Sequence, residues 1–281
     1  MKPSFYFYAN PYQPRSISSA QALQTEMEAR GAAVYTEAWL ARQGLGREAP
    51  LGRMPEGTRA LVAFGGDGTL LRCAPDAARQ RIPLLGVHTG TVGFLMPGDA
   101  EKPGELADLL LRAEYPVAEY PLLSVRYEGR RFLCVNDVSL TRGEHPGVME
   151  TLVEADGEII FRAHGDGAVV STPLGCTAYG LAAGGPVVRP DAPCLMITPL
   201  CARELTLRPV ILPLSARVSL HAPGSARRRL QLAIDGQTLL PVTEESRAEI
   251  QRAPETIRLI QPAPARFFDT LRQKQIIWNQ P

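Results

Sequence analysis

The sequence has almost no net charge, because 30 Lys and Arg residues stand against 29 Asp and Glu residues. A protein that binds duplex DNA uses an excess of positive charge to displace counterions from phosphates. We therefore expect no nucleic-acid partner. The sequence also lacks a signal peptide's apolar stretch near its start and any run approaching the ~18 apolar residues that span a bilayer. We expect a soluble, cytoplasmic protein with no membrane segment.

Cysteine is scarce, and its spacing matches neither a disulfide framework nor a zinc site. The five cysteines are odd in number and include no C-x-x-C pair. We expect reduced thiols that pack as small apolar residues. They are Cys73, Cys134, Cys176, Cys194 and Cys201. The sequence identifies no ligand set for a metal.

The first part of the chain alternates short apolar runs with helical patterns. We expect strands at 5–8, 60–64 and 83–87, and helices at 16–30 and 105–113. Strands that alternate with helices are typical of a parallel sheet covered by helices. Residues 1–118 are therefore predicted to form a Rossmann-like α/β domain.

From about residue 119 the apolar pattern changes to a period near two, which indicates strands. Three tight-turn pairs lie between strand-like runs and predict hairpins: Glu128-Gly129, Asp156-Gly157 and Asp235-Gly236. We expect residues 119–265 to form an all-β domain resembling a β-sandwich. The last segment, 266–281, begins with a helical pattern over 266–272 and is expected to pack back on the first domain.

The turn from Gly65 to Thr69 joins a buried strand to a predicted helix. Its glycines allow positive φ and close approach of a ligand, and a helix start favours an anion. The turn suits phosphate, although it lacks both the Lys of a Walker A loop and the G-x-G-x-x-G spacing. The alternative is plain strand-to-helix geometry, with Asp67 or Thr69 capping the helix.

A carboxylate within a phosphate-binding turn repels phosphate unless a metal or a reacting hydroxyl offsets its charge. In phosphoryl transfer, one carboxylate orients and deprotonates the attacking hydroxyl while Mg²⁺ bridges the phosphates. Asp67 fits the first role, with metal contact as a second possibility. We therefore expect Mg²⁺, or another divalent cation, to take part.

Further polar residues follow other strands. His88, in the Gly-rich loop after 83–87, is either a ligand contact or a loop histidine, and Phe94 fits the core better than an adenine platform. Asn136 and Asp137 interrupt an apolar, strand-like stretch at 133–138, where Asn136 can match an adenine edge or satisfy a structural need. The segment 165–186 contains hydroxyls and small residues, which suit either a pocket floor or a tight domain-interface turn.

Together these blocks resemble the NAD kinase family. The matching blocks are GGDGTLLR, GVHTGTVGFL, the Asn-Asp pair, GDGAVVSTPLGCTAYGLAAGGPVV, ITPLCARELTLRPVILP and FFDTLRQK. The resemblance implies an α/β domain and a β-rich domain with the substrate pocket between them. It also implies transfer of a phosphate from ATP, or another donor, to the 2′-hydroxyl of the adenosine ribose of NAD, giving NADP.

By this resemblance, Asp67 is the proposed general base. Asn136 and the Thr177-Ala178-Tyr179 run would hold the adenosine part, while Asp166 and Ala182 would lie near the nicotinamide riboside. The complete candidate NAD-binding set is Gly68, His88, Phe94, Asn136, Asp137, Asp166, Leu174, Thr177, Ala178, Tyr179 and Ala182. The candidate phosphate-binding set is Gly65, Gly66, Gly68, Thr69 and Arg72. The family implies a homodimer or homotetramer in which Asp166 can serve a partner chain's ligand.

The chain departs from the family pattern at three places. Asp137 stands where the family has Glu, Cys176 where Ser is common, and Ala202-Arg203 where Pro-His is frequent. Two alternatives therefore stand beside the kinase: a lipid kinase that shares the Gly-rich turn, and a non-catalytic dinucleotide binder. The residues leave open NAD against NADH, and ATP against polyphosphate.

Overall fold

The structure, a computed structural model, describes residues 2–90, 93–112, 114–144, 147–224, 230–262 and 267–274. The chain forms two compact units. The first unit comprises Met1–Glu119 and Ile257–Pro281, and the second comprises Tyr120–Thr256. The boundary at Thr256 falls within strand β18 (Arg247–Ile260), whereas the sequence pattern placed residues up to 265 in the second domain.

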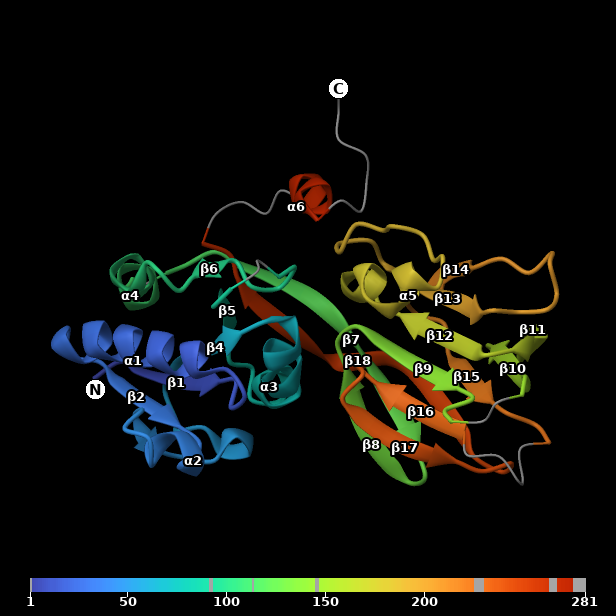
Figure 1. Cartoon of the computed structure of the whole chain (residues 1–281), viewed down its shortest axis with the longest axis horizontal. Helices are drawn as coiled ribbons and strands as arrows, with labels where there is room; N and C mark the ends of the chain where they lie inside the picture. Colours follow the sequence, from blue (N-terminus) through green and yellow to red (C-terminus); the bar gives the residue numbers. More distant parts are fainter. Residues whose placement is uncertain are drawn as a thin grey trace. The chain divides into compact units, whose positions relative to one another are not determined.

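The first unit is a parallel sheet with helices (Figure 1). The strands are paired in the order β3-β2-β1-β4-β5, with β6 beside β5, and each of these pairs is parallel. The strands are β1 (Ser4–Ala9), β2 (Ala33–Thr36), β3 (Arg47–Glu48), β4 (Thr58–Gly65), β5 (Leu84–His88) and β6 (Gly98–Asp99). The helices are α1 (Pro14–Ala29), α2 (Ala38–Ala41), the 3-10 turn η1 (Leu51–Arg53), α3 (Asp67–Arg79), α4 (Pro103–Leu111) and α6 (Phe267–Gln273).

The apolar pattern of these segments explains their packing. Every residue of β1 is buried, as expected for a central strand of a parallel sheet covered on both faces. Phe5 and Phe7 belong to a core cluster that also contains Ala20, Leu23 and Met27 of α1. This cluster includes side chains of α4, so two helices share one apolar layer with β1.

The predicted helices agree with the observed ones to within about two residues. Helix α1 begins at Pro14 rather than at Ser16, because proline fits the first helical turn, where its missing N–H costs nothing. Gly31, with φ of +82°, follows its C-terminal end. The predicted helix over 105–113 starts earlier, at Pro103, and residue 113 lies outside the described residues, as does residue 266 of the C-terminal helix.

The second unit contains antiparallel strands around one core. One set pairs β10 with β11 and β15, β15 with β18, and β7 with β8, and the other runs in the order β14-β13-β12-β9-β16-β17. Its strands are β7 (Val117–Tyr127), β8 (Arg130–Cys134), β9 (Asp137–Thr141), β10 (Met149–Ala155), β11 (Glu158–Gly165), β12 (Gly167–Ser171), β13 (Cys194–Leu200), β14 (Val210–Pro213), β15 (Val218–His221), β16 (Leu230–Ile234), β17 (Thr238–Val242) and β18. Two short helical turns interrupt this pattern, η2 (Leu174–Thr177) and α5 (Tyr179–Ala182).

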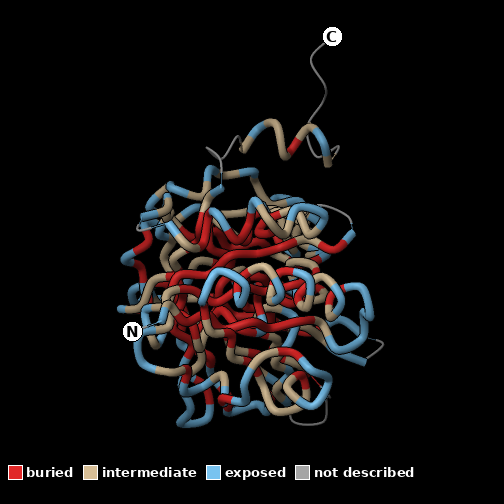
Figure 2. The backbone as a smooth tube through the Cα atoms, turned by 90° about the vertical axis from the view of Figure 1, so that its left-hand side faces the viewer, coloured by how far each residue is buried: buried red, intermediate tan, exposed pale blue. Residues whose placement is uncertain are grey.

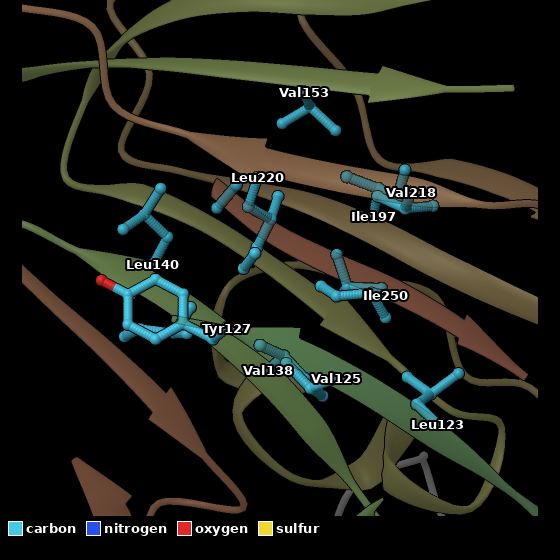
Figure 3. Close-up of a cluster of buried hydrophobic side chains, with 14 of the residues drawn as sticks. Leu123, Val125, Tyr127, Val138, Leu140, Val153, Ile197, Val218, Leu220 and Ile250 are labelled. Atoms are coloured by element: carbon cyan, nitrogen blue, oxygen red, sulfur yellow. The ribbon is translucent and has the colours of Figure 1, made fainter. Parts of the chain in front are cut away.

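The core of the second unit lies between these two sets of strands. Val125 of β7, Val153 of β10 and Leu220 of β15 meet Val138 of β9 and Ile197 of β13 in one buried cluster (Figure 3). In strands such as β7, β9, β15 and β16, alternate residues enter this cluster, which explains the period of two in the sequence. The expected fold class, an α/β domain followed by a sandwich-like all-β domain, is confirmed.

All three predicted tight turns close hairpins. Glu128 and Gly129 join β7 to β8, with φ values of +48° and +70°. The Asp156-Gly157 and Asp235-Gly236 pairs also have positive φ at both positions. Positive φ at both central residues matches the twist of a tight hairpin, which is why Asp-Gly predicts it.

The prediction of one continuous strand-like stretch over 133–138 is wrong. Strand β8 ends at Cys134 and β9 begins at Asp137, so Val135 and Asn136 lie between two strands. The backbone N–H groups of both residues donate to the carboxylate of Asp235 rather than to a neighbouring strand. A side chain about 100 residues away in the sequence thus ends the strand pairing.

Burial follows these elements, with the buried residues concentrated in the strands and the exposed ones in outer helices and loops (Figure 2). All five cysteines are free thiols. Cys73, Cys134 and Cys176 are buried as expected, whereas Cys201 is exposed. In the part of the chain that the structure describes, no helix is long and apolar enough to cross a membrane.

Candidate functional site

The Gly-rich turn connects β4 to α3 in a conformation that needs glycine. Gly65 has φ of +149°, and a Cβ atom on it would lie 2.4 Å from Oγ1 of Thr69. Gly66 precedes the helix, and its carbonyl accepts the N–H of Thr69 at 2.9 Å. The helix begins at Asp67, so the expected strand-to-helix turn is observed at these residues.

The Asp67 carboxylate is fixed by backbone groups from the loop after β5. Oδ2 accepts the N–H of Phe94 at 3.0 Å, and Oδ1 accepts the N–H of Leu95 at 2.9 Å. Gly93 lies so close that a Cβ atom there would be 2.1 Å from Oδ1 of Asp67. The loop and the turn therefore hold the carboxylate in one orientation, and the contact requires glycine at position 93.

The other candidates of the first unit lie on β5, on the loop that follows it and on α3. His88 ends β5 and is the register partner of Gly65 of β4. Phe94 is half-buried, and the Lys274 ammonium lies 5.2 Å from its ring centroid, so the segment after α6 contacts this loop. Arg72 is exposed on α3. Burial raises the pKa of the Tyr8 hydroxyl, and the nearby positive charge of Arg72 offsets part of that rise.

A pocket of about 450 Å³ lies at the carboxyl ends of β1, β4 and β5. In open α/β sheets, ligands collect at this edge. The lining comes from the β1–α1 turn, from Gly65-Gly66 and from the start of the loop after β5. The lining residues are Tyr12, Gln13, Pro14, Arg15, Gly65, Gly66, Thr89 and Gly90. The sequence pattern identified only the two turn glycines among them.

In the second unit, Asp235 organises the segment that contains Asn136. Its carboxylate accepts the N–H groups of Val135 at 2.9 Å, Asn136 at 2.6 Å and Asp137 at 3.2 Å. Burial raises the pKa of Asp235, and the N–H donors of Val135 and Asn136 offset part of that rise. The sequence suggested Asp235 only as a turn residue.

The block after β12 packs directly onto the backbone of Asn136. Thr172 donates its hydroxyl to the Val135 carbonyl at 2.6 Å and accepts the N–H of Gly175 at 2.9 Å. A Cβ atom on Gly175 would lie 2.2 Å from the Asn136 carbonyl oxygen. The structure therefore brings the Asn136 segment and the start of the 174–182 block together. Leu174, Thr177 and Ala178 are half-buried, and Ala182 is exposed.

Asp166 lies in a turn between β11 and β12 whose glycines meet other backbone. A Cβ atom on Gly167, whose φ is +135°, would lie 1.9 Å from the Leu140 carbonyl oxygen. The Asp166 carboxylate accepts Nε of Arg142 at 2.7 Å and is partly exposed. Tyr179 is 43% exposed, and burial followed by the charge of Asp166 raises its pKa. Close contact with neighbouring backbone therefore explains why glycine occupies these positions. Asp166 and Tyr179 lie near each other.

One of the departures from the family pattern has a structural account. Cys176 is buried, and its thiol donates to the Val188 carbonyl at 3.1 Å and accepts the Val188 N–H at 3.4 Å, the bonds that a serine hydroxyl would make. Asp137 is 5% exposed and lies near the backbone N–H of Tyr179. Arg203 is exposed, and nothing in the structure explains its substitution.

Asp137 is a buried carboxylic acid whose ionisation should make stability depend on pH. Burial, and then the charge of Asp235, raise its pKa to about 7, and the Tyr179 N–H offsets part of the rise. Because the folded state binds this proton more tightly than the unfolded state, the contribution of Asp137 to stability is largest below its unfolded pKa. That contribution should fall by a few kcal/mol between about pH 4 and pH 7 and level off above.

The variant Asp137→Asn mimics the protonated acid and should remove this dependence. We expect its free energy of unfolding to exceed that of the wild type at pH 8 and to match it near pH 4, measured by urea denaturation. Asp156→Asn, in an exposed hairpin turn, changes charge equally and serves as the control. Equal slopes for wild type and Asp137→Asn would contradict the assignment.

Asp67 is the carboxylate of the Gly-rich turn that could contact a divalent cation. Among the residues that the structure describes, no three side chains of His, Cys, Asp or Glu converge on one point. Mg²⁺ is commonly held by one or two carboxylates together with substrate phosphates and water. Asp67 is the acidic side chain in the first turn of α3 and would be the protein's contribution.

The chain is similar to proteins of one family along most of its length. Residues 18–115 match the family model of the ATP-NAD kinase N-terminal domain, and residues 135–262 match that of the C-terminal domain. The NAD kinase of Geotalea daltonii is 32% identical over 97% of this chain and 98% of its own length. The NAD kinase of Geobacter sulfurreducens is also 32% identical, with the same coverage.

Solved structures share the fold. Yeast NADH kinase complexed with NADH superposes with a TM-score of 0.88 at 22% identity, covering 99% of this chain and 89% of its own. An NAD kinase from Archaeoglobus fulgidus in complex with ATP gives a TM-score of 0.78 at 20% identity, covering 99% and 100%. The resemblance seen in the motifs is confirmed by two domain matches and by relatives that match over nearly their full length, and the chain belongs to the NAD kinase family.

Proposed function

We propose that the chain transfers the terminal phosphate of ATP to the 2′-hydroxyl of the adenosine ribose of NAD, giving NADP, with Asp67 as the general base. The family assignment supports the reaction, and the solved relatives were crystallised with NADH and with ATP. The observation that carries the role of Asp67 is its fixed carboxylate at the start of α3, beside the Gly65-Gly66 turn.

The geometry of Asp67 suits proton removal from a hydroxyl. Each carboxylate oxygen accepts one backbone N–H and retains a further lone pair for a ligand. In the proposed step, a 2′-hydroxyl donates its proton to Asp67 while its oxygen attacks the terminal phosphorus. The bond between that phosphorus and the bridging oxygen breaks, ADP leaves, and the proton passes on to solvent.

We further propose that Mg²⁺ accompanies the donor. When bound, the cation would neutralise part of the negative charge on the phosphate oxygens. The fixed orientation of Asp67 limits the direction from which a hydroxyl or a hydrated cation can approach its free lone pairs. The protein's own part is therefore positioning, which is the larger contribution in phosphoryl transfer.

The second unit supplies the candidate contacts to the dinucleotide. The backbone of Asn136 is engaged on both sides, because its N–H donates to Asp235 and its carbonyl accepts the Thr172 N–H at 2.8 Å. Its side-chain amide can thus offer a donor and an acceptor to adenine. Tyr179 offers an exposed ring, while Asp166 and Ala182 are proposed to contact the nicotinamide riboside.

The reaction is tested by incubating the purified protein with NAD, ATP and Mg²⁺ and measuring NADP with an NADP-specific dehydrogenase. Phosphorus NMR then distinguishes a 2′-phosphate from a 3′-phosphate. Parallel reactions with NADH and with polyphosphate identify the preferred acceptor and donor. Binding of NAD without any phosphate transfer from these donors would instead support a non-catalytic dinucleotide binder.

A homodimer or homotetramer in the cytoplasm remains our prediction for this family member. Sedimentation analysis with and without NAD measures the assembly. A monomer that phosphorylates NAD at full rate would contradict the expectation that Asp166 serves a partner chain's ligand.

A further inference from the structure

We propose that Lys274 is a positioning residue for the reaction: its ammonium group holds the ring of Phe94, and the backbone of Phe94 holds the carboxylate of Asp67. The inference rests on the proposed function, because it takes Asp67 as the group that receives the proton of the acceptor hydroxyl. Lys274 directly follows helix α6, far along the sequence from the Gly-rich turn.

The two N–H groups that bind Asp67 are held in place to different degrees. Leu95 is 5% exposed, and a Cβ atom on Gly86 of β5 would lie 2.3 Å from its carbonyl oxygen. The next residue, Met96, is fully buried and meets the same glycine. Close packing on the sheet therefore fixes the Leu95 N–H, which binds Oδ1 of Asp67.

Phe94, the other donor, is less buried than Leu95. Its N–H donates to Oδ2 of Asp67 at 3.0 Å, and its half-buried ring lies 5.2 Å, from centroid to Nζ, from the Lys274 ammonium. A cation within about 6 Å of a ring centroid is attracted by the ring's negative face. The ring and the N–H belong to one residue, so a contact that fixes the ring also restricts the N–H.

Helix α6 gives the Lys274 side chain a fixed starting point. Leu271 of this helix is fully buried. The backbone N–H of Lys274 donates to the Thr270 carbonyl at 3.1 Å, which extends the helical turn. Because the backbone is already anchored, the contact with Phe94 costs the conformational entropy of one side chain only.

Loss of the cation should lower the rate more than it changes substrate binding. Without it, Phe94 can leave the position in which its N–H binds Asp67, and the carboxylate is then held by Leu95 alone. In Lys274→Met we expect kcat to fall about fivefold, which corresponds to about 1 kcal/mol and to the loss of one such contact. The KM values for NAD and ATP should stay within about twofold. Lys274→Arg keeps a cation over the ring and should retain kcat to within about twofold.

A spectroscopic measurement tests the contact without any turnover. The sequence contains three lysines, Lys2, Lys102 and Lys274, so reductive methylation with ¹³C-formaldehyde gives few N-methyl signals, and the methylated amines keep their positive charge. The ring current of Phe94 should shift the Lys274 signal upfield of the Lys102 signal. Lys274→Arg assigns that signal by removing it, and Phe94→Leu should return it to the position of the Lys102 signal.

Lys102→Met is the matched control, because Lys102 is an exposed lysine of the same unit that pairs with Glu105 at 3.1 Å. It should leave kcat within about twofold of the wild type, and thermal unfolding of each variant shows whether the fold is kept. Phe94→Leu keeps the N–H but removes the ring. It should therefore lower kcat as Lys274→Met does, and the double variant should lose little more.

An unshifted Lys274 signal, or wild-type kcat in Lys274→Met, would overturn the inference and leave the proposed function intact. A raised KM at unchanged kcat would make Lys274 a substrate-binding residue, and an equal loss in Lys102→Met would show that the effect is not specific. Either result would also overturn it. A protein with the shifted signal that forms no NADP would instead reject the proposed function, and the positioning role with it.

Discussion

Replacing Asp67 by asparagine is expected to lower kcat by about 10²- to 10⁴-fold, the usual contribution of a general base. Asparagine is close in size, but its amide cannot take the proton of the ribose hydroxyl. Its NH₂ group would also face one of the two N–H donors, Phe94 or Leu95, that now bind the carboxylate. The KM values for NAD and ATP should change far less than kcat, because the lost interaction belongs to the transition state.

The control for this variant is Asp76→Asn, which makes the same chemical change on the same helix. Asp76 pairs with Arg79 on the surface, so its loss should leave kcat within about twofold, since exposed pairs contribute ~0–1 kcal/mol. Thermal unfolding of both variants separates loss of the base from loss of the fold. A folded Asp67→Asn protein with wild-type turnover would remove Asp67 from the mechanism.

The substitution Gly93→Ala should lower kcat by about 10²-fold, although residue 93 carries no reactive group. The added methyl group would overlap Oδ1 of Asp67, at 2.1 Å, and Cγ of Met96, at 2.9 Å. The carboxylate has to move, and a displacement of about 1 Å in a reacting group can cost that much. Stability should fall by about 1–3 kcal/mol, as is usual for overpacking.

A double-mutant cycle tests whether Gly93 acts through Asp67. With Asp67→Asn already present, Gly93→Ala should reduce the residual rate only slightly, because the group it displaces is no longer a base. Gly104→Ala is the control, since its Cβ atom would meet nothing closer than 3.9 Å. Multiplicative losses in the double mutant would show that Gly93 acts through something other than the carboxylate.

Sequence patterns predicted the elements whose cause is local. The buried run at 5–8, the spacing of Ala20, Leu23 and Met27, and the paired positive-φ residues of three hairpins are all properties of a few neighbouring residues. They were found to within about two residues of their observed ends. The Gly-rich turn and Asp67 were found for the same reason.

Long-range contacts escaped the same patterns. The N–H groups that orient Asp67 come from Phe94 and Leu95, and the carboxylate that fixes Asn136 comes from Asp235, 99 residues along the chain. No local spacing marks such contacts. The residues of the β1–α1 turn that line the first-unit pocket were missed for a related reason, because only the sheet order brings that turn beside the end of β4.

Asp235 links the β16–β17 hairpin to the segment that precedes β9. Opening that hairpin would release three backbone N–H groups, those of Val135, Asn136 and Asp137, at the same moment. These amides should therefore exchange with solvent deuterium at the rate of the hairpin, as members of one cooperative unit. A ligand that binds Asn136 would then slow exchange in a hairpin it never touches.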